Sequence, residues 1–160
     1  MAIARSVGEE SPNPFVSSPF PSPPPQAAAH KTEGGEAFSE GSYAQAVLCY
    51  TQALSKVGAY MEGNESLYAT LLSNRAACFL KLGHHEKALA DAAECVERDP
   101  DNVKGWFRKG MSLHAMGKWR EALEALGKAR DMEGGKNKQV EQAIRFCEMR
   151  MEREMRARMS

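Results

Sequence analysis

Three glycines anchor an internal repeat along most of the chain, and this repeat constrains the fold more than any other sequence feature. Gly41, Gly83 and Gly117 stand in FSEGSYAQAV, LKLGHHEKAL and AMGKWREAL. A small residue stands seven positions before each glycine. After each glycine, a residue with a ring side chain follows at the second position, an alanine at the fifth and a small residue at the twelfth. These residues are Gly34, Tyr43, Ala46 and Ala53, then Ala76, His85, Ala88 and Cys95, then Gly110, Trp119, Ala122 and Ala129. The recurrence predicts three copies of one structural unit.

Each unit is predicted to be a pair of antiparallel helices that turns at the glycine. Small residues let two helices approach closely, while larger apolar neighbours fill the spaces between successive pairs. The second and third glycines are 34 residues apart, and the first and second are 42 apart. Eight extra residues therefore lie in or beside VGAYMEGNESL. Pro100 occupies the hinge after the second unit, and Gly58 and Gly134 occupy it in the others.

The sequence thus predicts an all-α solenoid of seven helices, six in three hairpins and a seventh as a cap. The expected ranges are 27–40, 43–57, 66–82, 85–98, 102–116, 119–132 and 137–158. The seventh helix has an apolar side and i,i+4 ion pairs worth a few tenths of a kcal/mol each, as a solenoid end requires. Its apolar residues are Val140, Ile144, Cys147, Met151 and Met155, and its pairs are Glu141 with Arg145, Glu152 with Arg156 and Glu154 with Arg158. Beyond Met151 we expect a solvated projecting end, although the Met and Arg alternation leaves a contact with a partner or a membrane surface open.

Residues 1–26 hold all but one of the eight prolines and few aliphatic residues. Such a segment buries too little apolar area to offset its ordering entropy, so we expect a disordered, partly polyproline tail. Asn13-Pro14-Phe15 and Pro21 to Pro24 are short enough to match docking motifs by chance, and a linker is the favoured interpretation. Ser11, Ser18 and Ser22 precede proline and are possible phosphorylation sites.

The overall composition argues against several classes of function. Lys plus Arg and Asp plus Glu both number 21, so no global field attracts nucleic acid or an anionic membrane. We expect no targeting segment and no membrane span, hence a soluble, cytosolic chain. The four cysteines lack paired spacing, which favours buried thiols in a reducing compartment; they are Cys49, Cys78, Cys95 and Cys147. No metal or cofactor is expected, because the repeat already accounts for His84 and His85 beside Cys78 and Cys95.

The 34-residue period is that of tetratricopeptide repeats. The stretches LLSNRAACFLKLG and VKGWFRKGMSLHAMG resemble the second and third repeats of heat-shock co-chaperones, which bind the Glu-Glu-Val-Asp terminus of the major cytosolic chaperones. The resemblance covers about residues 27–150. It implies a domain over 27–135, with repeats at about 27–60, 69–102 and 103–136, and a capping helix over 137–160. In such repeats the first helix of each pair lines a concave groove.

The resemblance also implies a carboxylate clamp in that groove. Offsets from the repeat glycines assign the clamp positions to Lys31, Gly35, Asn74, Lys104 and Arg108. Spacing of four puts Lys104 and Arg108 on one helical face, where both cations can reach ligand carboxylates. Residues one turn along the same faces would form the floor and walls for the upstream part of the peptide; they are Phe38, Ala77, Lys81 and Met111.

Gly35 departs from the clamp pattern, which has asparagine at that position. One amide donor is lost, and each glycine of Gly34-Gly35 costs about 1 kcal/mol in a helix relative to alanine. Three explanations stay open: the clamp is weakened, a water fills the gap, or the ligand differs from the usual tail.

Three functional hypotheses follow. The first is a monomeric adaptor that captures the acidic C-terminal peptides of cytosolic heat-shock chaperones. The second is a scaffold that binds another peptide or a helix in the same groove. The third, an enzyme, is rejected because no phosphate loop, metal ligand set or nucleophile motif is present, and the histidines at 30, 84, 85 and 114 have no evident acidic partner.

Overall fold

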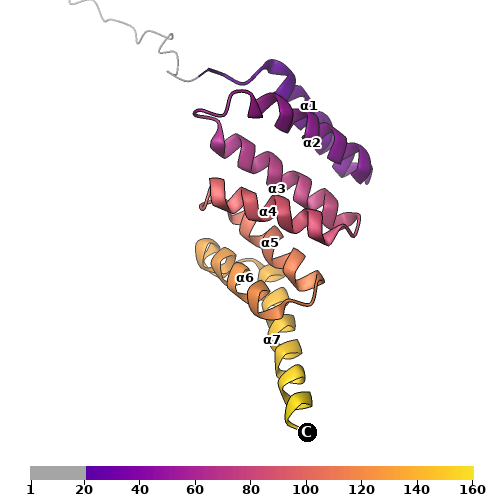
Figure 1. The fold of residues 1–160 in the computed structure, drawn as a ribbon, viewed down its shortest axis with the longest axis vertical. Coiled ribbons are helices and arrows are strands. Elements are labelled where there is room, and N and C mark those ends of the chain that lie inside the picture. Colours follow the sequence, from indigo (N-terminus) through magenta and orange to yellow (C-terminus); the bar gives the residue numbers. More distant parts are fainter. Residues whose placement is uncertain (1–20) are drawn as a thin grey trace, which may run out of the picture.

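The computed structural model describes residues 21–160, which form seven helices stacked in chain order (Figure 1). Six helices pair as hairpins, α1 with α2, α3 with α4 and α5 with α6, and α7 packs on α6 and α5. Their bounds are α1 Pro25–Ser39, α2 Tyr43–Gly58, α3 Glu65–Lys81, α4 His85–Arg98, α5 Val103–Ala115, α6 Trp119–Glu133 and α7 Lys138–Met159. The predicted all-α solenoid with a C-terminal capping helix is confirmed.

The three repeat glycines end the first helix of each hairpin. Gly41, Gly83 and Gly117 have φ angles of +79°, +75° and +73°, in the left-handed region where glycine carries no Cβ penalty. In each turn the next N–H bonds the carbonyl five residues back, as in His84 to Phe79 at 2.9 Å. This satisfies a helix-end carbonyl and reverses the chain. The ring residue two places on then begins the second helix, as predicted.

Small residues allow the two helices of a hairpin to touch. A Cβ on Gly34 would lie 2.9 Å from the ring of Tyr50, and a Cβ on Gly110 would lie 2.5 Å from Cγ of Leu126. Real Cβ atoms do not come so close to a buried neighbour, so glycine is required for this spacing. The repeat alanines on the second helices, Ala46, Ala88 and Ala122, are fully buried.

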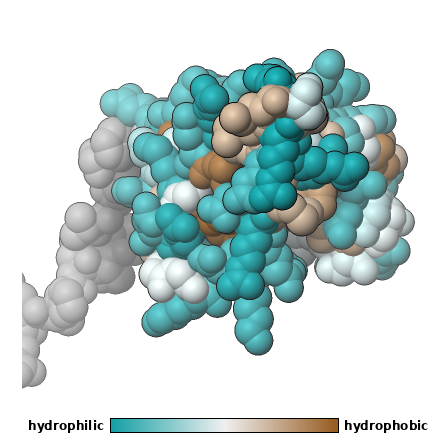
Figure 2. All heavy atoms as spheres, turned by 90° about the horizontal axis from the view of Figure 1, so that it is seen from below, coloured by the Kyte–Doolittle hydropathy of each residue, from teal (hydrophilic) through white to brown (hydrophobic). Residues whose placement is uncertain are grey.

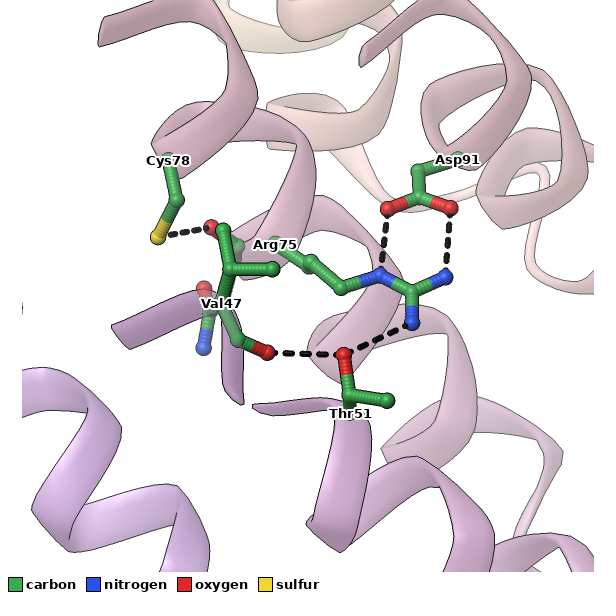
Figure 3. Close-up of polar contacts among 6 residues, drawn as sticks. Val47, Thr51, Arg75, Cys78 and Asp91 are labelled. Carbon is green, nitrogen blue, oxygen red and sulfur yellow. Dashed lines mark hydrogen bonds and ion pairs between the residues drawn. The ribbon is translucent and has the colours of Figure 1, made fainter. Parts of the chain in front are cut away.

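Polar contacts around Arg75 join the two helices of the second hairpin and link them to the first hairpin (Figure 3). Arg75 on α3 donates from Nε and from a terminal nitrogen to the two carboxylate oxygens of Asp91 on α4, at 2.7 and 2.8 Å. It also donates to the hydroxyl of Thr51 on α2 at 3.2 Å. The Arg75 and Asp91 side chains are 22% and 9% exposed. A two-pronged pair of this kind fixes both the distance and the angle between helices.

Helix α1 begins two residues earlier than predicted, at Pro25. Proline suits the first turn because its missing N–H would have no helical partner there. Just before the helix, the carbonyl of Pro21 accepts a hydrogen bond of 3.1 Å from the side chain of Asn64, in the loop between α2 and α3. The rest of the predicted tail, with Asn13-Pro14-Phe15, Ser11 and Ser18, lies outside the described residues.

Helix α7 covers the open end of the last hairpin with its apolar side. Val140, Ile144 and Cys147 are buried there. Glu154 accepts a 2.8 Å hydrogen bond from the indole of Trp119 on α6, instead of pairing with Arg158 as expected. Of the three predicted i,i+4 pairs, only Glu152 with Arg156 lies within 4.0 Å in the described part of the chain.

Past this contact α7 extends beyond the stack (Figure 1). Seen from that end, the surface is mostly hydrophilic, with hydrophobic residues gathered near its middle (Figure 2). Met155 and Met159 are 58% and 88% exposed. Between residues 21 and 160, none of the helices combines the length and the hydropathy that crossing a bilayer requires.

Candidate functional site

A groove of about 630 Å³ crosses the C-terminal parts of the first helices of all three hairpins. Its wall is completed by α4 and α7. Five of the nine candidate residues line it, and they come from α1, α3 and α5: Phe38, Ala77, Lys81, Arg108 and Met111. The structure therefore brings together side chains that are up to 73 positions apart in the sequence.

The other four candidates lie on the same three helices but do not line this groove. Three of them are one helical turn before a lining residue: Gly35 precedes Phe38, Asn74 precedes Ala77, and Lys104 precedes Arg108. Lys31 lies one turn further back on α1. Both lysines are exposed and Asn74 is half-buried. Within residues 21–160, neither lysine is within 4.0 Å of a carboxylate.

Arg108 is the charged residue best placed to attract a ligand. Its guanidinium lies over the ring of Phe107, 5.3 Å from the centroid. Its Nε is buried and has no hydrogen-bond partner in the described chain, and no carboxylate of residues 21–160 pairs with it. Burial lowers the pKa of Arg108, because desolvation disfavours the charged form. A half-buried cation without an anion is a site that an anionic ligand would satisfy.

The thiol of Cys78 on α3 is fully buried. It donates to the carbonyl of Asn74, one turn back on α3, at 3.3 Å. Burial raises the pKa of Cys78 to about 11, and a hydrogen bond from its own backbone and the charge of Arg108 oppose this only in part. A thiol held protonated in this way is a packing residue and not a nucleophile.

The cysteines share this structural role. All four are buried and unbridged. Burial also raises the pKa of Cys95, to about 12. In the described part of the chain, no group of three or more His, Cys, Asp or Glu residues is arranged to hold a metal ion.

The far half of the groove is aromatic and was missed by sequence reasoning. His114 on α5 lies between Trp119 on α6 and Phe146 on α7, with ring centroids 5.5 and 4.8 Å away. Phe146 is 40% exposed and lines the groove. The other missed lining residues are Leu80, His85, Phe107, Ala115, Gln139, Gln142 and Ala143. A signal was present, because 139, 142, 143 and 146 form a second helical stripe beside the buried stripe of α7.

Comparison with known proteins identifies the family of this chain. Residues 39–129 match the family model described as anaphase-promoting complex, cyclosome, subunit 3. The TPR domain of Sgt2 from Aspergillus fumigatus has a TM-score of 0.74 and 32% identity, covering 84% of this chain and 85% of that one. The second TPR domain of human RPAP3, solved in complex with the HSP70 peptide SGPTIEEVD, has a TM-score of 0.67 and 30% identity, covering 77% and 95%.

Curated full-length relatives are much longer than this chain. The heat shock protein sti1 homologue of Schizosaccharomyces pombe is 41% identical over 87 residues, which are 54% of this chain and 13% of that protein. The chain spans 11% to 30% of the length of three such relatives. These matches confirm the predicted resemblance. The chain therefore belongs to the tetratricopeptide-repeat family, and repeat domains of heat-shock co-chaperones are among the members it resembles.

Proposed function

We propose that this chain is an adaptor that holds the free C-terminus of an acidic peptide, of the Glu-Glu-Val-Asp type found on cytosolic heat-shock chaperones. The observation that carries the proposal is the half-buried guanidinium of Arg108, which has no carboxylate partner among residues 21–160. Binding, not catalysis, is the proposed activity. We assign it to the cytosol, because the four cysteines are unbridged thiols and the proposed ligands are cytosolic.

The charged and neutral hydrogen-bond donors would have different roles. Lys104 and Arg108, one turn apart on α5, would hold the terminal and side-chain carboxylates of the last ligand residue, with Lys31 approaching from α1. Each charge-assisted bond is worth roughly 1.5–3 kcal/mol. Asn74 would donate its amide without adding repulsion to the cations. Every donor comes from a single chain, so we propose that the binding unit is a monomer.

The groove beyond Arg108 would take the residues upstream of the ligand terminus. Phe38, Ala77 and Met111 offer apolar contacts, and Lys81 offers a cation to acidic side chains. The peptide of the RPAP3 complex ends in Glu-Glu-Val-Asp, which supports the same ligand class for this chain.

Charge reversal at Lys104 tests the proposal. We expect Lys104→Glu to weaken the binding of a labelled peptide ending in Glu-Glu-Val-Asp by at least about tenfold, measured by fluorescence anisotropy. Lys87→Glu is the matched control, because it makes the same charge change on α4, and Lys87 does not line the groove. Equal losses for the two variants would mean that net charge alone governs binding. The competing scaffold hypothesis, which Gly35 motivates, predicts partners without acidic termini whose binding survives Lys104→Glu.

A further inference from the structure

Gly35 has no side chain at the clamp position, and the side chain of Tyr50 lies next to that position. A Cβ added to Gly35 would lie 3.8 Å from the hydroxyl oxygen of Tyr50, an ordinary contact distance, and would meet no other atom within 4 Å. At Gly34, an added Cβ would meet the edge of the same ring at 2.9 Å. The phenol therefore packs against both glycines of α1, with its ring at Gly34 and its hydroxyl at Gly35.

This hydroxyl is available for a ligand. The residue as a whole is buried, at 4% exposure. No hydrogen bond joins the hydroxyl to another group of residues 21–160, so none of these residues competes with a ligand for it. A phenol held in place by a buried ring loses little freedom when it donates to a ligand.

Tyr50 on α2 also belongs to the same buried cluster as Cys78 on α3. Burial raises the pKa of Tyr50, and the thiols of Cys78 and Cys49 raise it further through charge interactions. The thiol of Cys78 interacts in the same way with Arg108 and bonds the carbonyl of Asn74. Cys78 thus packs in the cluster that holds the phenol ring and bonds the backbone of the clamp asparagine.

We propose that the Tyr50 hydroxyl supplies the hydrogen-bond donor that Gly35 lacks, and so completes the carboxylate clamp together with Asn74 and Arg108. This inference rests on the proposed function. A hydroxyl donating to a carboxylate makes a short, charge-assisted bond, about as strong as the amide bond it would replace. Like an amide, it adds no charge to repel the neighbouring cations. Gly35 is then part of an alternative clamp, because the absence of a side chain there leaves the phenol hydroxyl uncovered on that side.

A double-mutant cycle on the intact chain tests this assignment. The variants are Tyr50→Phe, Gly35→Asn and the two combined, each titrated calorimetrically with a free-acid peptide ending in Glu-Glu-Val-Asp. Tyr50→Phe should weaken binding about tenfold. Gly35→Asn alone should change affinity less than about threefold, since the donor is already present, but should recover most of the loss in the Tyr50→Phe background.

Two further peptides separate ligand contact from a structural role. One carries a C-terminal amide and the other has asparagine in place of the last aspartate. The penalty for Tyr50→Phe should disappear with whichever peptide lacks the carboxylate that the hydroxyl contacts. An equal penalty with all three peptides would overturn the inference, and so would unchanged affinity of Tyr50→Phe for the free acid.

The outcomes also distinguish this inference from the function it rests on. If Tyr50→Phe does not fold, Gly35→Asn decides alone, because a gain of about tenfold would mean that the donor position is empty in the parent. If the parent binds free-acid and amidated peptides equally, the proposed function fails and the inference fails with it. If the parent prefers the free acid and the cycle shows no coupling, only the role of Tyr50 is wrong.

Discussion

Replacing Arg108 with methionine is expected to stabilise the free protein while weakening its hold on a carboxylate ligand. The Nε of Arg108 is buried without a partner in the described chain. A buried polar group left unsatisfied costs about 1–3 kcal/mol, and methionine fills a similar volume without that cost. Some of the guanidinium still reaches water, so we take the low end. The free energy of unfolding of the ligand-free protein should rise by about 1 kcal/mol.

Binding should change in the opposite direction. The lost charge-assisted bonds are worth about 1.5–3 kcal/mol, which corresponds to roughly 10- to 150-fold in Kd. Urea unfolding with and without peptide measures both effects, because a ligand stabilises the folded state by RT ln(1 + [L]/Kd). Lys104→Met is the control: Lys104 is exposed, so its loss should weaken binding and leave the free protein unchanged. This reasoning would be refuted if ligand-free Arg108→Met were less stable than the parent by more than about 1 kcal/mol. It would also be refuted if peptide stabilised the variant as much as it stabilises the parent.

Three further predictions concern the fold. Gly110→Ala should lower the free energy of unfolding by about 1–2 kcal/mol, because its Cβ would lie 2.5 Å from a buried leucine. Gly127→Ala should raise the free energy of unfolding by about 0.5–1 kcal/mol, because its Cβ would meet no atom within 4 Å. Thermal unfolding that shifts both variants in the same direction would contradict this. Arg75→Met should cost about 3 kcal/mol by leaving Asp91 buried and unpaired, and adding Asp91→Leu should recover most of it in urea titrations; no recovery would argue against a desolvation penalty. Burial lowers the pKa of His114, so its contribution to stability is fully present above about pH 6.5 and is lost as the pH falls through the folded-state pKa. His114→Phe should flatten the plot of unfolding free energy against pH in that range. An unchanged plot would exclude His114 as the source of the pH dependence.

The helices and their turns could be predicted because local chemistry determines them. Glycine adopts the left-handed turn at Gly41, Gly83 and Gly117 without strain, so the ends of three helices could be read directly. The start of α1 was placed two residues late because Pro25 was counted with the prolines before it. Proline breaks a helix when it lies in the interior but is favourable in the first turn, and sequence alone did not separate these two roles.

The candidate site was predicted only where it follows the repeat. Residues at fixed offsets, such as Ala77 and Arg108, line one groove because successive hairpins stack with the same geometry. Contacts between elements of different type do not follow that rule. The approach of Tyr50 to Gly35 depends on the rotamer of a side chain on the second helix, and the place of Phe146 in the groove depends on how the capping helix docks. Neither contact follows from the repeat offsets, although the second helical stripe of α7 marks Phe146 as a candidate.

The central claim is that this groove recognises the free acid at the end of a peptide chain. Isothermal titration with two peptides of identical sequence ending in Glu-Glu-Val-Asp, one a free acid and the other amidated, tests it most directly. Removing one carboxylate from a clamp of charge-assisted donors should weaken binding at least about tenfold. Equal affinity for the two peptides would contradict the account.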